Sequence, residues 1–347
     1  MLLTVVVPAY NVANYIQKTL LSLINQRSIP IEIIVVDDGS TDDTSVIATK
    51  LFEKKGFKSG RVIRQPNAGV AAARNRGLAE AKGTYVYFLD ADDHVDPNFS
   101  NEVGLSITRS PKADVLCWAF DTVDENGKRI KSYEGSYPIF SRDLTGMDTL
   151  REILINKCMW IWTGSAAYRR SFLEKNGLQY SRGCTNGEDQ EFTFKALAHA
   201  KQVVFLAKVL SYYVQRRGSI TNSFNVKKFD AVDAMLRTGE YLENLNKPVL
   251  DEVSEVLLNE KVLMTYIGNY MSCLRHLRQE GHSAVSANKF LKDIINEEYP
   301  ELVMTLNRKL RKRTGSMMLD VTKLLFTISP TLCGLLYGLR DKLRLVN

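Results

Sequence analysis

The chain has 347 residues, of which 45% are hydrophobic and 24% charged, as in an ordinary folded protein with room for one large domain and a smaller one. Five cysteines and four histidines are scattered, and no C-x-x-C spacing occurs. This pattern argues against a disulfide framework or a zinc site and for a reducing cytosol. The apolar run Met1–Pro8 has no basic segment before it and is too short for a signal peptide, so we expect a buried strand there.

Charge is unevenly distributed along the chain. The net charge is +7, but Glu301–Asn347 alone contains nine Lys or Arg against three Asp or Glu, a local excess of six. The first 300 residues are therefore almost neutral. A basic tail of this kind predicts contact with an anionic surface, either membrane lipid or nucleic acid.

The first half of the chain alternates short apolar runs with helical periodicity. We predict strands over Leu3–Val7, Ile31–Val36, Arg61–Arg64 and Tyr85–Leu89, and helices over Tyr15–Gln26, Asp43–Lys55 and Gly69–Ala81. This alternation predicts an α/β domain whose mostly parallel sheet is covered on both faces. No G-x-G-x-x-G follows the first strand and no Walker A motif is present, so neither nucleotide-binding fingerprint applies.

The remaining chain is first mixed and then helical. Up to about Ser223 we predict strands near Val115–Phe120 and Val203–Phe205 and a helix over Asp189–His199. Beyond roughly Asn225 we predict helices over Phe229–Asn246, Val249–Arg278 and Ser283–Asn296, followed by a basic and apolar C-terminal region. We therefore expect two domains, over residues 1–224 and 225–347.

The run Tyr85–His94 carries the strongest chemical signal. A buried strand leads directly into Asp90, Asp92 and Asp93, which must emerge at the carboxyl edge of the sheet, where ligands bind in α/β folds. Clustered carboxylates repel one another unless a cation lies between them, and oxygen ligands suit Mg²⁺ or Mn²⁺. The alternative is a solvated acidic turn, because Asp is common in turns.

Two further segments follow strand ends. The pair Asp37 and Asp38 comes after the second strand, where one carboxylate can accept hydrogen bonds from a base or a ribose hydroxyl. Pro8–Asn11 follows the first strand and offers Tyr10 as an aromatic face for a base, a contact worth ~1–3 kcal/mol. Taken alone, the first segment is better explained by a turn with a helix cap, and the second by a strand that ends at a proline and is followed by a surface tyrosine.

Two helix starts complete the set. Gln65–Leu78 contains Gly69 and three alanines, so the N-terminus of this slim helix suits an anion and Arg74 can reach a phosphate; tight packing on the sheet is the alternative. Gly187–Phe192 opens a helix with acidic residues, which the helix dipole favours in any case, or of which one is a general base. All four segments lie where an α/β sheet binds ligands, and their conjunction is specific.

These motifs resemble those of the family 2 glycosyltransferases from about Leu3 to Thr221. The matching segments are Thr4–Asn11, Asp37–Asp42, Asn67–Asn75, Phe88–Asp93, Tyr168–Leu173, Gly187–Asp189 and Tyr213–Thr221. The resemblance implies the GT-A nucleotide-binding fold with a helical C-terminal region. It also implies inverting transfer of a hexosyl or N-acetylhexosaminyl group from a nucleoside-diphosphate sugar, usually a UDP-sugar, to a hydroxyl.

The resemblance also implies a role for each matching residue. Ala9 and Tyr10 would border the base, Asp38 would bond the uracil, and Asn67 and Arg74 would contact the uracil or the diphosphate. In the D-x-D element, Asp90 would lie near the ribose and the metal, and Asp92 would ligate Mn²⁺ or Mg²⁺. Asp189 would be the catalytic base with Glu188 as its structural neighbour, and Arg216, with Ser219 nearby, would close over the diphosphate. These roles agree with inversion, which needs a base on one side of the anomeric carbon and neutralised charge on the other.

Two departures from the family pattern concern the metal and the acceptor. Many relatives have a metal-ligating histidine where this chain has Arg216 and Arg217, so either another metal ligand or help from arginine is needed. A Trp-Asn-Lys element is replaced by Trp160–Ser165, in which Trp160 or Trp162 would stack on the acceptor sugar or pack in the core.

The tail and the acceptor leave alternatives open. Leu324–Leu339 is uncharged over sixteen residues but contains Pro330, which falls short of the ~20 residues that span a bilayer. Residues 308–347 therefore suit either an in-plane contact with an anionic membrane or packing on the catalytic domain. We expect a cytoplasmic enzyme, peripheral on the inner face of the membrane in the first case, that glycosylates a glycan or a lipid-linked sugar for surface polysaccharide.

The rival functions are a nucleotidyltransferase, a non-catalytic binder of nucleotide sugars or nucleic acid, and an enzyme that glycosylates a teichoic-acid-type polymer. No Gly-rich, Lys-bearing loop follows the first strand, which argues against the nucleotidyltransferase. No nucleic-acid motif appears, and retained Asp90, Asp92 and Asp189 argue against a decayed site.

Overall fold

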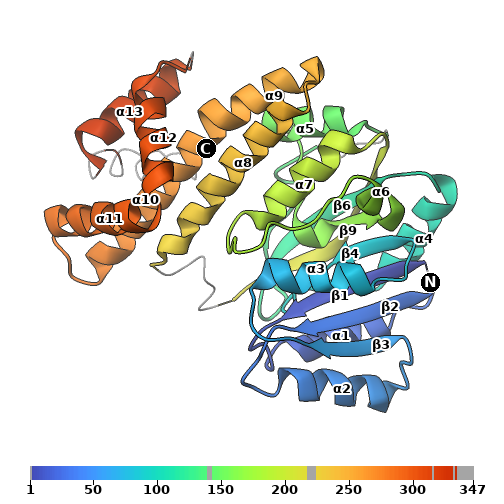
Figure 1. The fold of residues 1–347 in the computed structure, drawn as a ribbon. Coiled ribbons are helices and arrows are strands. Elements are labelled where there is room, and N and C mark those ends of the chain that lie inside the picture. The colour runs from blue at the N-terminus through green and yellow to red at the C-terminus, as the bar shows by residue number, and fades with distance from the viewer. Residues whose placement is uncertain (1, 139–142, 217–223, 315, 331–332, 334–347) are drawn as a thin grey trace. The chain divides into compact units, whose positions relative to one another are not determined.

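A computed structural model describes residues 2–138, 143–216, 224–314, 316–330 and 333 (Figure 1). The chain divides into two compact units, one of residues 1–216 with 247–253, and the other of residues 217–246 with 254–347. The domain boundary predicted at residue 225 stays a prediction. Arg217, Ser219 and most of the segment beyond Pro330 lie outside the described residues.

The first unit is built on a nine-stranded sheet in the order β3-β2-β1-β4-β8-β6-β9-β5, with β7 paired to β6. The strands are β1 (Leu3–Ala9), β2 (Ile31–Asp37), β3 (Gly60–Arg64), β4 (Tyr85–Phe88), β5 (His94–Val95), β6 (Val115–Asp124), β7 (Arg129–Lys131), β8 (Ala166–Arg169) and β9 (Val203–Gln215). Strands β3, β2, β1 and β4 are parallel, which confirms the prediction for the first half. Strand β8 runs antiparallel to both β4 and β6, so the sheet becomes mixed beyond β4.

Seven α-helices accompany this sheet in the described part of the first unit (Figure 1). They are α1 (Ile16–Ile24), α2 (Thr44–Lys55), α3 (Val70–Glu80), α4 (Phe99–Arg109), α5 (Gly146–Leu154), α6 (Arg170–Lys175) and α7 (Glu188–His199). Helix α1 buries Ile16, Leu20 and Leu23 at helical spacing against the fully buried strands β1 and β2. The helices α1, α2, α3 and α7 lie within two residues of their predicted bounds.

Strand β9 is longer than the strand predicted near Val203–Phe205. It continues to Gln215 beside β6, with polar residues such as Lys208 facing outward. Because β6 and β9 run parallel, the end of β9 lies at the same edge of the sheet as the end of β6. This pairing carries Arg216 towards the loop that follows β4.

The second unit is helical, as predicted. Its helices are α8 (Asp230–Asn244), a π-helical segment (Leu257–Lys261), α10 (Val262–Gln279), α11 (Ala284–Glu298), α12 (Pro300–Arg311) and α13 (Met317–Ile328). Helix α9 (Asp251–Val256) begins in the first unit and ends in the second. The single helix predicted over Val249–Arg278 is therefore interrupted by a π-helical segment. The hydrophobic core of the second unit includes Phe229, Tyr270 and Phe326. Among the described helices none has the length and apolar content that crossing a membrane requires.

Close packing of α3 on β1 gives the first prediction. A Cβ atom added at Gly77 would lie 2.2 Å from Cγ1 of Val6, which is a rigid β-branched side chain. We expect Gly77→Ala to lower the free energy of unfolding by about 1–3 kcal/mol through overpacking, although alanine is the better helix former. The measurement is urea unfolding followed by circular dichroism.

The matched control is Gly268→Ala in α10, where an added Cβ meets nothing within 4 Å. We expect it to leave the free energy of unfolding unchanged or to raise it by up to ~1 kcal/mol. Equal effects of the two substitutions would contradict the packing argument.

Candidate active site

The loop after β2 is fixed by its two aspartates. Both oxygens of Asp38 accept hydrogen bonds from the segment before α3: Oδ1 from Nε2 of Gln65 at 2.7 Å and the backbone of Ala68 at 3.0 Å, and Oδ2 from the backbone of Gly69 at 2.8 Å. Asp38 is only 3% exposed, so most of its acceptor capacity is used within the protein. It joins the β2 loop to the start of α3, and its predicted bond to a base stays a prediction.

The neighbouring Asp37 holds the turn itself. Its Oδ1 accepts the backbone N–H of Ser40 at 2.8 Å, and its Oδ2 accepts the hydroxyl of Ser45. Burial acts to raise the pKa of Asp37, but these hydrogen bonds and Arg64 hold it below its usual value. The turn needs Gly39, which has φ +79° and whose added Cβ would lie 2.9 Å from the backbone nitrogen of Asn67.

The predicted base-binding residues lie around this turn. Ala9 is buried at the end of β1, whereas Tyr10 is half exposed and Asn67 is exposed. An exposed aromatic ring beside a rigid turn at the carboxyl edge of the sheet can serve as a stacking surface.

Arg74 lies at the centre of the site. Its Nη1 donates to Oε1 of Glu188 and its Nη2 donates to Oδ1 of Asp90, each at 2.8 Å, and its side chain is 4% exposed. The guanidinium also lies over the ring of Tyr180, 5.1 Å from its centroid. Burial acts to lower the pKa of Arg74, but Asp90, Tyr180 and Glu188 raise it well above its usual value, so the residue is a fixed cation.

This geometry gives Arg74 a different environment from the one expected. Both Nη atoms are engaged by carboxylates, and the remaining Nε is buried without a hydrogen-bond partner among the described residues. Arg74 therefore links α3 to α7 and to the loop after β4. Direct contact with a diphosphate stays a prediction.

The three aspartates after β4 differ in exposure. The side chain of Asp90 is 33% exposed and that of Asp92 is 19% exposed, whereas Asp93 is buried. Oδ1 of Asp93 accepts the backbone N–H of Val214 at 2.7 Å, which ties this loop to β9. Burial raises the pKa of Asp92 and raises that of Asp93 well above its usual value, and in both cases the neighbouring aspartates add to the rise.

Arg216 reaches this loop from the end of β9. Its Nε lies 2.7 Å from Oδ2 of Asp92, and its guanidinium lies 4.7 Å from the centroid of the Tyr15 ring. Arg216 therefore pairs with Asp92 of the D-x-D element, and its predicted contact with a diphosphate stays a prediction. Asp92 lies between a cation on one side and further carboxylates on the other.

The donor set can be tested for its fit to a divalent metal. No group of three or more His, Cys, Asp or Glu side chains arranged to hold a metal occurs in the described part of the chain. Mg²⁺, however, is commonly held by one or two carboxylates together with substrate phosphates. Partly exposed Asp90 and Asp92 provide such a pair, and the buried Oδ2 of Asp93 has no hydrogen-bond partner among the described residues. The residues fit a cation that the substrate helps to bind.

The predicted catalytic base opens α7. Asp189 is partly exposed, and its Oδ2 accepts the hydroxyl of Thr163 at 3.2 Å. Its neighbour Glu188 is buried against Arg74; burial raises the pKa of Glu188 and Asp189 adds to the rise, while Arg74 opposes it. Glu188 thus anchors the first turn of α7, and Asp189 is the carboxylate that remains accessible.

An aromatic cavity lies beside the base. It has a volume of about 320 Å³ and includes the rings of Phe120, Tyr133, Tyr137, Trp160, Trp162 and Tyr213. The centroid of the Trp162 ring lies 5.3 Å from that of the Phe120 ring and 5.3 Å from that of the Tyr213 ring. Both predicted tryptophans line this cavity, and Trp162 is followed directly by Thr163, whose hydroxyl donates to Asp189.

Three residues of the site were not predicted from the sequence: Tyr180 below Arg74, Thr163 on Asp189, and Tyr15 below Arg216. None belongs to a motif that reveals its role. Each acts through a contact with a residue far away in the chain, and periodicity carries no signal for such contacts.

The Arg74 bridge gives the second prediction. Arg74→Met keeps the length of the side chain but leaves Glu188 buried without its cation, so we expect the free energy of unfolding to fall by about 3–5 kcal/mol. The control is Arg76→Met on the same helix, where the side chain is 54% exposed and pairs with Glu80; we expect a change within about 0.5 kcal/mol. Urea unfolding of both variants checks the difference, and similar losses would show that Arg74 is not the link.

Comparison with known proteins places this geometry in a family. Residues 4–177 match the family described as Glycosyl transferase family 2. The uncharacterized glycosyltransferase YibD of Escherichia coli is 30% identical over 72% of this chain and 73% of its own length, and the putative glycosyltransferase EpsH of Bacillus subtilis is 30% identical over 70% of each. The solved structure of Staphylococcus aureus TarS 1–349 in complex with UDP-GlcNAc superposes with a TM-score of 0.64 at 25% identity, covering 80% of this chain and 81% of that one. The chain therefore belongs to glycosyl transferase family 2 and is a glycosyltransferase with the GT-A fold.

Proposed function

We propose that this enzyme transfers a sugar from a UDP-sugar to a hydroxyl of a glycan or lipid-linked acceptor, with inversion, during the assembly of a cell-surface polysaccharide. The observation that supports the proposal is the connection Asp90–Arg74–Glu188, because Arg74 bonds both to the D-x-D element and to the residue that precedes Asp189. Inversion requires a base on one side of the anomeric carbon and neutralised charge on the other. The two ends of this connection are suited to these two tasks.

Asp189 is the group we assign as general base. The residue is partly exposed, and its carboxylate is oriented by the hydroxyl of Thr163, which donates to Oδ2, and by the backbone N–H of Gln190, which donates to Oδ1. The aromatic cavity beside it would hold the acceptor sugar through Trp160 or Trp162, because aromatic rings bind the apolar faces of sugar rings. Glu188 would act as a positioning residue, since its carboxylate is used by Arg74.

The donor would occupy the edge formed by the loops after β1, β2 and β4. Tyr10 would stack on the base and Asp90 would lie near the ribose. Asp90 and Asp92 would hold Mn²⁺ or Mg²⁺, which, when bound, neutralises the charge of the leaving diphosphate. Arg216 would add positive charge on the same side, because its guanidinium is 30% exposed beside Asp92.

The relative TarS bears on both the donor and the acceptor. The structural neighbour TarS was solved with UDP-GlcNAc, which supports a UDP-sugar donor. The curated S. aureus TarS is named a poly(ribitol-phosphate) beta-N-acetylglucosaminyltransferase, and this chain covers 39% of it at 28% identity. A teichoic-acid-type polymer therefore remains the second candidate for the acceptor.

The base assignment gives the third prediction. We expect Asp189→Asn to lower the rate of sugar transfer by at least ~10²-fold, because amide nitrogen and oxygen cannot take the hydroxyl proton. Binding of UDP, measured by calorimetry, should change little, since Asp189 lies at the acceptor side. Unchanged transfer in Asp189→Asn would refute the assignment.

A matched control for this test lies in the same turn of α7. Glu191 is buried and bound to Lys195 at 2.6 Å and to Ser181 at 2.7 Å, so it cannot serve an acceptor. Glu191→Gln should retain most of the transfer rate of the folded enzyme.

Screening a panel of nucleotide sugars by thermal shift would then identify the donor, because a bound ligand raises the unfolding temperature.

The metal gives the fourth prediction. We expect EDTA to abolish transfer and to weaken UDP binding, and added Mn²⁺ or Mg²⁺ to restore both. Asp92→Asn should remove the effect of metal on UDP binding. The control Asp96→Asn should preserve this effect, because the carboxylate of Asp96 accepts hydrogen bonds from the hydroxyl of Tyr212 at 3.1 Å and from the backbone N–H of Asn98 at 2.8 Å. UDP binding that is equal with and without metal in the unmodified enzyme would contradict this role for Asp90 and Asp92.

A further inference from the structure

The helix α13 presents apolar side chains to solvent. Its inner face buries Leu319 and Phe326, and the Phe326 ring packs 5.1 Å from that of Tyr270 in the core of the second unit. The outer face of such a surface helix is normally polar. On α13 it is apolar instead, so the helix carries apolar residues on both faces.

The outer residues form a continuous row, which we call the α13 stripe. Its members are Met317, Val321, Leu324 and Ile328, which are 84%, 47%, 60% and 68% exposed and recur every three or four residues. Together with Met318, this one helix holds five of the thirteen large hydrophobic side chains that are exposed in the described part of the chain. A concentration of this kind marks an interaction site rather than scattered surface residues.

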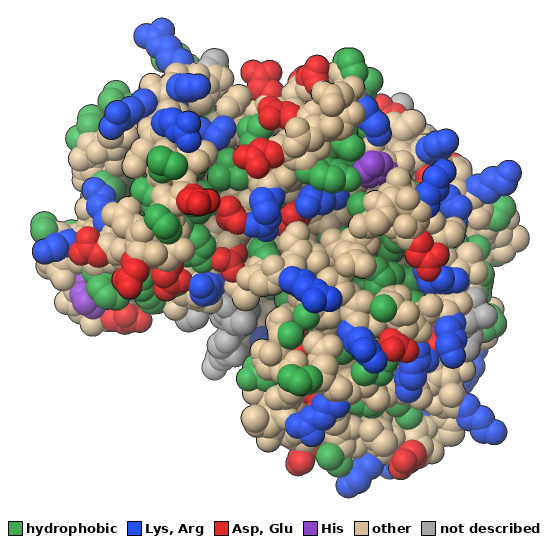
Figure 2. Space-filling model, in the orientation of Figure 1, with side chains coloured by type: hydrophobic (Ala, Val, Ile, Leu, Met, Phe, Trp, Pro, Cys, Tyr) green, Lys and Arg blue, Asp and Glu red, His purple; other side chains and the backbone are tan. Residues whose placement is uncertain are grey.

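A group of cations directly precedes the stripe. This basic cluster consists of Arg308, Lys309, Arg311, Lys312 and Arg313. Three of its members lie in the last turn of α12 and Lys312 is the C-cap, so the dipole of that helix also favours cations at these positions. Figure 2 shows Lys and Arg side chains together with hydrophobic ones in the region that α12 and α13 occupy in Figure 1.

Hydrogen bonds connect the basic cluster to the helix that carries the α13 stripe. The buried Lys323 of α13 donates to the backbone oxygen of Lys312 and binds Asp320 at 3.0 Å. Asp320 in turn accepts the backbone N–H of Thr314 at 3.0 Å. These bonds connect the end of the basic cluster to the first turns of α13, and Arg313 lines a shallow pocket together with Met317, Val321 and Leu324 of the stripe.

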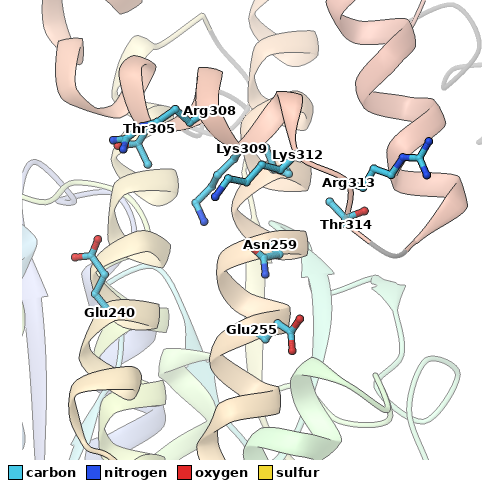
Figure 3. A pocket seen from close by; sticks show the side chains of 10 residues that line it. Glu240, Glu255, Asn259, Thr305, Arg308, Lys309, Lys312, Arg313 and Thr314 are labelled. Atoms are coloured by element: carbon cyan, nitrogen blue, oxygen red, sulfur yellow. The ribbon is translucent and has the colours of Figure 1, made fainter.

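Part of the cluster lines a cleft of about 690 Å³ within the second unit. In Figure 3, Lys309 and Lys312 extend into this cleft above Asn259, while Glu240 and Glu255 lie on the facing helices. Four cations line the cleft against these two carboxylates, and among the described residues none of the four is in an ion pair within 4 Å. The cleft is therefore positive and can accept a phosphate group.

We propose that the α13 stripe and the basic cluster together form an in-plane docking surface for a membrane that contains anionic lipid. The stripe enters the boundary between headgroups and acyl chains, and the cluster binds lipid phosphates. A second copy of the chain is the less suitable occupant, because a two-fold contact through the stripe would bring two basic clusters together. The proposal deepens the proposed function, since a lipid-linked acceptor lies at such a surface.

Binding of the full-length chain to vesicles tests the proposal. Vesicles of phosphatidylcholine alone are compared with vesicles that also contain phosphatidylglycerol, by co-sedimentation. We expect binding only to the anionic vesicles, and a fall with added salt. Leu324→Asp should lower the partition coefficient at least tenfold, and the double change Lys312→Glu, Arg313→Glu should lower it by roughly fivefold or more for each cation removed.

Matched controls exist on other helices. Val285→Asp changes a side chain of α11 that is 81% exposed, and Lys54→Glu with Lys55→Glu reverses two cations in the last turn of α2. Both controls should bind vesicles like the unmodified chain. Circular dichroism establishes that every variant is folded.

Several outcomes would overturn the proposal. Equal loss in the controls and in the stripe variant would remove the assignment to α13, and equal binding to both kinds of vesicle would remove the role of lipid charge. If Leu324→Asp dissociated a dimer in light scattering and left vesicle binding unchanged, the stripe would be a contact between copies. Vesicle binding needs no sugar transfer, so it can be read even if the proposed function fails, and transfer to a soluble acceptor should be unchanged in the α13 variants.

Discussion

The site depends on one buried cation, the guanidinium of Arg74 between Glu188 and Asp90. Without this cation the carboxylates of Glu188 and Asp90, which come from segments far apart in the chain, would repel each other in a poorly solvated site. Arg74 makes their approach favourable and fixes both through hydrogen bonds in the plane of its guanidinium. Tyr180 supports the flat face of the same group. The start of α7 and the loop after β4 can therefore lie in one site.

This arrangement separates residues that position the site from residues that remain accessible to substrates. Arg74, Glu188 and Asp93 are buried and bonded to protein, and Asp93 also joins the β4 loop to β9 through Val214. Asp90, Asp92 and Asp189 are partly exposed; Asp92 directly precedes buried Asp93, and Asp189 directly follows buried Glu188. Neighbouring acids thus have opposite tasks, since one of each pair faces the protein and the other faces the solvent.

The sequence predicts those parts of the molecule that local patterns determine. Strands β1 to β4 and helices α1 to α3 follow from apolar periodicity, and Asp90 and Asp92 follow from their place at a strand end. The partners of Arg74 cannot be predicted in this way. Glu188 lies 114 residues further along the chain, and a buried arginine can pair with any carboxylate that the fold brings near it. Short strands such as β5 and β8 are also missed, because two to four residues carry too little periodicity to distinguish a strand from a loop.

Arg216 illustrates what an arginine provides where the family resemblance leads one to expect a histidine. Its Nε pairs with Asp92 at 2.7 Å, and the Tyr15 ring supports its face. A guanidinium has two further nitrogens in the same plane, so it can keep this pair and still donate to an anion beside it. A histidine at this place would give a metal one neutral ligand, whereas arginine carries a permanent positive charge. Under the proposed function, arginine and a bound cation together would balance this loop of aspartates, and both would face the diphosphate of the donor.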